Sequence, residues 1–184
     1  MKPIFTIHAG EYLVAAEIEK NLKNTNVWIP SIDTGIDLLL TDKQNKSTVS
    51  LQVKFSKDFN PTHLKENLRP HIKGSGWWTL NRKKIEDSQA DFWVFVLYSF
   101  QKKTNDYIII EPKQLLSLFD SLQRMGNPHV YLTVTEKNKA FETRGLNKNE
   151  MLAVCNETYH NDKRDLTNYL NNWDSITSLL NVKL

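Results

Sequence analysis

The alternation of apolar and polar residues between Ile36 and Phe55 predicts two strands joined by a polar turn. Apolar side chains occupy the even positions of 36–40 and the odd positions of 49–55. Side chains on a strand alternate between its two faces, so Gln52 and Lys54 share the polar face of the second strand. Residues 42–47 have the polar composition of a hairpin loop. An antiparallel pairing would then bring Asp37 beside Gln52 and Lys54.

Helical and strand patterns follow one another along the rest of the chain, which predicts an α/β fold. Residues 92–98 are apolar at every position, as expected of a central strand covered on both faces. We expect a mixed central β-sheet flanked by helices, in one domain over 1–184, with 147–184 as a C-terminal helical extension. The other predicted elements are helices at 10–24 and 82–88 and after Pro112, and strands at 27–29, 76–80, 107–110 and 130–134.

Composition limits the class of protein without naming its activity. Hydrophobic residues make up 40% of the chain and charged residues 24%, as in ordinary globular proteins. No apolar run approaches the roughly 18 residues that span a membrane, and residues 1–8 lack the apolar region of a signal peptide. The single Cys155 excludes an internal disulfide and a cysteine-based zinc site. We therefore expect a cytoplasmic protein without a membrane partner, with Cys155 as a small buried hydrophobe.

Basic residues are concentrated between Lys54 and Lys84. This segment carries eight basic and two acidic residues, a charge of +6 in a chain of net charge +3. A basic segment suits a phosphate backbone, although a solvated, lysine-rich surface would give the same pattern. Trp77 and Trp78 should point to opposite faces of their strand, so that one is buried and the other can be exposed. The residues predicted to contact nucleic acid are Lys57, Lys65, Arg69, Lys73, Arg82, Lys83 and Lys84.

The polar residues of the predicted hairpin suit a divalent cation. A carboxylate and an amide oxygen are hard ligands of the kind that bind Mg²⁺, which usually takes one or two protein carboxylates together with substrate phosphates. A lysine beside such an ion can orient the attacking water or stabilise charge on a phosphate. The chain shows no Ser-His-Asp, zinc-ligand or glycine-rich phosphate-loop pattern.

The spacing D-x14-Q-x-K, from Asp37 through Gln52 to Lys54, resembles the PD-(D/E)xK nuclease superfamily. The order of a glutamate-bearing helix, a Gly-Ile-Asp strand and a Gln-Val-Lys strand is most similar to its Mrr-like and Holliday-junction-resolvase-like branch. The resemblance implies a restriction-endonuclease-like fold and an endonuclease that hydrolyses DNA with Mg²⁺, or with Mn²⁺ as substitute. It also implies that Asp37, Gln52 and Glu11 bind the metal and that Lys54 positions the water nucleophile. Gln52 replaces an acidic residue and so removes one negative charge from that site.

Several alternatives stay open at this point. Glu11 begins the buried stripe of its predicted helix, but a glutamate in a first turn is also favourable to the helix dipole. Glu17 lies off that stripe, and Asp33 fits a turn better than a metal site. The second functional class is a catalytically silent nucleic-acid-binding module of the same fold, and a third is a protein-interaction or defence accessory domain. The C-terminal helix either packs on the sheet or forms a homodimer.

Overall fold

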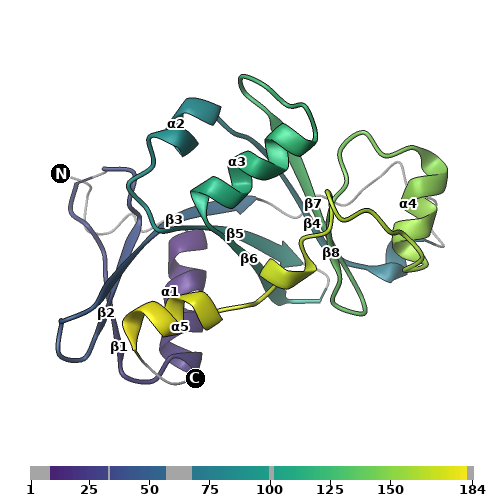
Figure 1. Ribbon diagram of the computed structural model, residues 1–184. Coiled ribbons are helices and arrows are strands. Elements are labelled where there is room, and N and C mark those ends of the chain that lie inside the picture. The colour runs from purple at the N-terminus through teal and green to yellow at the C-terminus, as the bar shows by residue number, and fades with distance from the viewer. Residues whose placement is uncertain (1–8, 33, 57–67, 100–101, 182–184) are drawn as a thin grey trace.

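The computed structural model spans residues 1–184 and describes 9–32, 34–56, 68–99 and 102–181 (Figure 1). Its largest sheet has five strands in the order β1-β2-β3-β5-β6, with β3 and β5 parallel and the other neighbours antiparallel. The prediction of an α/β fold with a mixed central sheet flanked by helices is therefore confirmed. The first elements are α1 (Ala9–Asn21), β1 (Thr25–Trp28), β2 (Leu38–Asp42), β3 (Thr48–Ser56), η1 (Arg69–His71), β4 (Ile72–Thr79), α2 (Arg82–Glu86) and β5 (Phe92–Ser99); the remaining ones are β6 (Thr104–Ile110), α3 (Pro112–Ser121), β7 (His129–Thr135), β8 (Ala140–Glu142), α4 (Lys148–Cys155), η2 (Thr167–Tyr169) and α5 (Asp174–Leu180).

The hairpin of β2 and β3 forms with the predicted faces. Leu38 pairs with Leu51 and Leu40 with Val49, and all four side chains are fully buried. They join one apolar cluster with Val14 and Ile18 of α1 and Ile176 and Leu180 of α5. In Figure 1, α1 and α5 accordingly lie together on one side of the sheet. The other face of β3 is left to its polar residues.

Strand β5 is central and buried on both faces, as its continuous apolar run predicts. Its side chains divide between two cores with the period of two expected of a strand. Phe92, Val94 and Val96 join the cluster under α1 and α5. Trp93, Phe95 and Leu97 join a second cluster with α2, α3 and a further sheet.

That further sheet has three antiparallel strands in the order β4-β7-β8. It packs on the α2 and α3 side of β5, where the rings of Trp78 and Phe95 meet edge to face at 5.1 Å. Trp78 is buried and Trp77 is 45% exposed, so the prediction that the two tryptophans face opposite ways is confirmed. Because β4 has eight residues, it carries the chain roughly 26 Å. Lys73, near the start of β4, is thereby separated from Lys84, which follows the end of this strand in α2.

The C-terminal segment differs from the predicted helical extension. It is helical in α4 and α5, with a 3₁₀ turn at η2, but not over 156–166. Leu166 and Leu170 fall at helical spacing, yet the backbone of Leu166 donates to Ala140 O at 2.8 Å and Leu170 forms a bridge to Ile108. The apolar period therefore reflects separate contacts with two sheets. Among the described residues, no helix is both long and apolar enough to cross a membrane.

Candidate functional site

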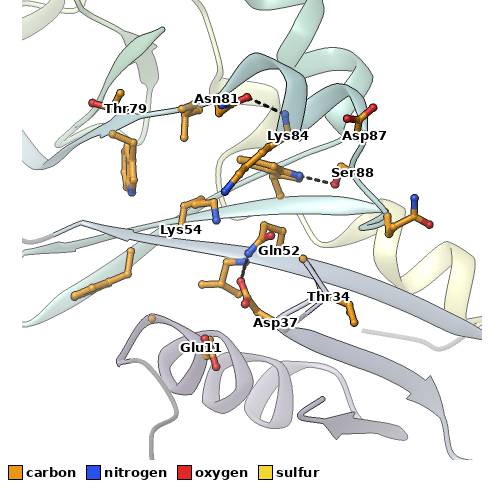
Figure 2. Close-up of a pocket in the computed structure, with 18 of the residues that line it drawn as sticks. Glu11, Thr34, Asp37, Gln52, Lys54, Thr79, Asn81, Lys84, Asp87 and Ser88 are labelled. Atoms are coloured by element: carbon orange, nitrogen blue, oxygen red, sulfur yellow. Dashed lines mark hydrogen bonds between the residues drawn. The ribbon is translucent and has the colours of Figure 1, made fainter. Parts of the chain in front are cut away.

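A cleft of about 1320 Å³ opens between the start of α1, the end of β3, the end of β4 and α2 (Figure 2). All four residues predicted as catalytic, Glu11, Asp37, Gln52 and Lys54, line this cleft. They come from three elements and are brought together by the hairpin register and by the packing of α1 on the sheet. The remaining lining residues are Ala9, Gly10, Thr34, Gly35, Val53, Phe55, Trp78, Thr79, Leu80, Asn81, Lys83, Lys84, Asp87, Ser88, Gln89 and Trp93.

Asp37 lies directly before β2 and beside Gln52 of β3. Its backbone N–H donates to the carbonyl oxygen of Leu51 at 2.8 Å, and Leu51 is also the strand partner of Leu38. Its Oδ2 accepts the backbone N–H of Val53 at 2.8 Å and a hydrogen bond from Nε2 of Gln52. The side chain is only 7% exposed. Asp37 is therefore held by β3 while it still borders the cleft.

Gln52 presents its amide nitrogen to Asp37. The hydrogen bond runs from the Nε2 donor to the carboxylate, and the carbonyl oxygen lies on the side of Gly35, where a Cβ would be 3.9 Å from Oε1. A metal ligand must offer its oxygen, because the amide nitrogen is a donor only. For Gln52 to share a cation with Asp37, this hydrogen bond must break and the amide must turn over.

Glu11 occupies the first turn of α1 and is 3% exposed, which agrees with its place at the head of the buried stripe. The helix can approach β3 closely because Gly10 has no side chain: a Cβ there would lie 2.5 Å from Cβ of Phe55. This contact fixes the start of α1 at the mouth of the cleft. Glu17 is not among the lining residues and accepts a hydrogen bond from Asn21.

Lys54 projects from the same face of β3 as Gln52, with its Nζ 5.0 Å from the ring centroid of Trp93. A cation over an indole face is attracted by the ring quadrupole. Trp93 is itself fixed, since its Nε1 donates to Oγ of Ser88 at 3.0 Å. Parallel pairing places Trp93 beside Gln52. The ring thus gives the lysine ammonium a defined position in the cleft.

The predicted nucleic-acid contacts do not form one surface. Lys83 and Lys84 are exposed and line the cleft. Arg82 pairs instead with Asp120 at 2.7 Å and Glu86 at 2.9 Å, and hydrogen bonds to these carboxylates raise the pKa of its guanidinium. Arg69 and Lys73 lie at the other end of β4, where Lys73 Nζ is 2.7 Å from Oδ1 of the buried Asp106. Lys57, Lys65 and Asp33 lie outside the described residues.

Some residues of the cleft carry no signal in the sequence. Trp93 reads as one more apolar residue of a buried strand, and only the parallel register of β3 and β5 reveals it beside Gln52. Asn81 reads as part of a loop, yet its Oδ1 accepts the backbone N–H of Lys84 at 3.1 Å and caps α2.

Cys155, which lies outside the cleft, is the small buried residue that the sequence predicts: it is 2% exposed, and burial raises the pKa of its thiol.

The donor atoms in the cleft suit a hard cation better than a transition metal. Glu11 and Asp37 supply carboxylates and Gln52 can supply an amide oxygen, a set of the kind that Mg²⁺ uses. In the part of the chain that the structure describes, no group of three or more His, Cys, Asp or Glu residues could hold a metal.

Comparison with protein-family models, curated proteins and solved structures found no match to this chain.

Proposed function

We propose that this protein is a metal-dependent endonuclease that hydrolyses DNA phosphodiester bonds, with its active site in the cleft around Asp37. The observation that carries the proposal is the convergence of Glu11, Asp37, Gln52 and Lys54 on one cleft. These residues lie up to 43 positions apart in the sequence, and the resemblance to the nuclease superfamily implied a role for each of them. If Gln52 and Lys54 were only solvated residues on one face of the sheet, the first turn of α1 would not be expected to border the same cleft.

The order of the elements supports a restriction-endonuclease-like fold. Helix α1 precedes the antiparallel strands β1, β2 and β3, and after η1, β4 and α2 the chain reaches β5, which pairs parallel to β3. This arrangement resembles the core of the nuclease superfamily that the D-x14-Q-x-K spacing suggests. In that resemblance the strand that carries Gln-x-Lys supplies catalytic residues, and here that strand is β3, with Gln52 and Lys54 on its polar face.

Each residue has a distinct role in the proposed reaction. Asp37 and Glu11 would hold Mg²⁺, or Mn²⁺ as a substitute. The amide oxygen of Gln52 would join them once the hydrogen bond from Gln52 Nε2 to Asp37 is broken and the amide has turned over. The ion would activate water and stabilise negative charge on the phosphate. Lys54, seated on Trp93, would orient the water or contact a phosphate oxygen. Asp37 keeps its Val53 N–H bond throughout, which fixes one carboxylate oxygen.

Cleavage of plasmid and branched DNA in Mg²⁺ tests the proposal. Lys54→Ala should reduce the cleavage rate by about 10²- to 10³-fold, because removal of a preorganised charge-stabilising group costs on this order. Lys43→Ala is the matched control, since this exposed lysine in the turn between β2 and β3 does not line the cleft. Equal activity of wild type and Lys54→Ala on both DNA forms would defeat the assignment.

The second candidate is a catalytically silent nucleic-acid-binding module of the same fold. The hydrogen bond from the Gln52 amide to Asp37 favours it, because Gln52 then presents its amide nitrogen to Asp37 and not the oxygen that a cation would need. Calorimetry with Mn²⁺ separates the two candidates: the enzyme binds the ion through Asp37, and the module binds DNA without it.

We further propose a cytoplasmic location, consistent with the lone buried Cys155.

A homodimer is a separate proposal. Helix α5 uses Trp173, Ile176 and Leu180 to pack on the sheet and leaves Leu179 54% exposed. Its apolar stripe is therefore largely occupied within one copy. Sedimentation of the free protein and its DNA complex would decide whether two copies associate.

A further inference from the structure

The wall of the cleft opposite Asp37 and Glu11 is basic and is formed by α2. Lys83 and Lys84 are exposed and line the cleft from this helix, while Lys54 rises from β3. Figure 2 shows Lys84 extending from α2 toward the ammonium end of Lys54, whereas the Asp87 carboxylate is directed away from both. The cleft is therefore divided into a carboxylate side and an ammonium side.

Helix α2 is held firmly enough to give Lys84 a defined position. Asn81 caps its first turn through the backbone N–H of Lys84. Ile85 is 1% exposed and packs in the core with α3, and Arg82 bridges to Asp120 of α3. A side chain on a fixed backbone loses less conformational freedom on binding than one on a free loop. The fixed backbone of α2 thus holds Lys84 at the cleft before a ligand binds.

Lys54 and Lys84 place two positive charges in the same cleft, and an anion that lies near both is attracted by both. A phosphate oxygen that accepts from both would make charge-assisted hydrogen bonds, which are stronger than neutral ones. We propose that Lys54 and Lys84 form a phosphate-binding subsite on the α2 side of the cleft, in which Lys84 contacts a non-bridging phosphate oxygen of the substrate. This deepens, and rests on, the proposed nuclease function, and it makes Lys84 a further catalytic residue. Lys83 contributes only general positive charge.

Phosphate binding can be measured without any divalent ion, by nuclear magnetic resonance of the Trp93 indole N–H. This proton reports on the subsite because Lys54 lies over the ring, and Trp93→Phe assigns its signal. Inorganic phosphate should shift the signal in wild type. Lys84→Ala should weaken the apparent phosphate affinity about tenfold, as expected for loss of one charge-assisted hydrogen bond. Lys84→Arg should retain most of the affinity, and Lys83→Ala should change it less than twofold.

A second titration uses a short single-stranded oligonucleotide with and without a 5′-phosphate. Equal dependence on Lys84 for both forms identifies the backbone diester as the ligand, and dependence only for the phosphorylated form identifies a terminal phosphate. Equal weakening by Lys83→Ala and Lys84→Ala, or no shift of the Trp93 signal by phosphate, would overturn the subsite. Lys84-dependent phosphate binding in a protein that never cleaves DNA would refute the nuclease proposal and leave the subsite standing. DNA cleavage at the wild-type rate in Lys84→Ala would refute the subsite and leave the nuclease proposal standing.

Discussion

Asp37 in the cleft and Glu142 in β8 are both carboxylates taken largely out of water, but they are stabilised in different ways. Glu142 is fully buried and is bound by Arg124 through two hydrogen bonds of 2.7 Å and by Arg164 at 2.6 Å. The backbone N–H groups of Tyr131 and Arg144 also donate to it. The hydrogen bonds described for Asp37 include one from the neutral amide of Gln52 and one from the backbone N–H of Val53.

The difference indicates which carboxylate can exchange its partners. Two guanidinium groups fix the charge of Glu142, which is not one of the residues that line the cleft. The Gln52 amide can turn over without unfolding any strand, and Asp37 borders the cleft where it does so. A buried ion pair of fixed geometry serves the fold, whereas a carboxylate held by a rotatable neutral donor at a cleft can serve a ligand.

The largest effect on stability should come from Glu142→Gln. Loss of this charge leaves two arginines partly buried without their counter-ion, and breaking a buried pair costs about 3–5 kcal/mol. Urea unfolding measures the change. Glu136→Gln is the control, because the Glu136–Lys102 pair is well exposed and should contribute less than about 1 kcal/mol. Equal losses in the two variants would remove the contrast between fixed and exposed pairs.

Asp37→Asn should separate function from stability. The asparagine oxygen can still accept the Val53 N–H, so we expect the free energy of unfolding to stay within about 1 kcal/mol of wild type. Mg²⁺-dependent cleavage should fall about 10²- to 10³-fold, since the charge that holds the ion is lost. Asp87→Asn, at an exposed position of the same cleft, should retain activity. A large loss of stability in Asp37→Asn would place Asp37 with Glu142 as a structural carboxylate.

Gln52→Glu should raise metal affinity by a smaller amount. A second carboxylate beside Asp37 restores the negative charge that Gln52 removes, and we expect Mn²⁺ to bind about tenfold more tightly by calorimetry. Without metal the two carboxylates repel, so the variant should melt at a lower temperature in a chelator than in Mn²⁺. Gln89→Glu adds the same charge elsewhere in the cleft and should leave the Mn²⁺ affinity nearly unchanged. Equal affinity gains in both variants would show that only general charge matters.

Local patterns predicted the strand pair and the side chains that share its polar face, because both depend on short-range geometry. The period of two placed Gln52 and Lys54 on one face, and the turn at 42–47 brought Asp37 opposite Gln52. The same reasoning identified β5 as a central strand. The orientation of the Gln52 amide could not be predicted, because it depends on a hydrogen bond between two side chains.

Long-range arrangement was not predictable from the same patterns. The basic residues are close in sequence, yet β4 carries Lys73 away from Lys84, and ion pairs occupy Lys73 and Arg82. The apolar period of 166–180 predicted one helix, although Leu166 and Leu170 use their backbone groups to join two sheets. Trp93 could be placed at the site only once the parallel register was known.

A crystal soaked in Mn²⁺ and measured for anomalous scattering tests the central claim most directly. The account predicts one peak in the cleft, in contact with a carboxylate oxygen of Asp37 and the amide oxygen of Gln52, with the Gln52–Asp37 hydrogen bond broken. Contact with Glu11 would complete the proposed ligand set. Saturating Mn²⁺ that leaves the Gln52 amide bonded to Asp37, with no peak beside either residue, would contradict it.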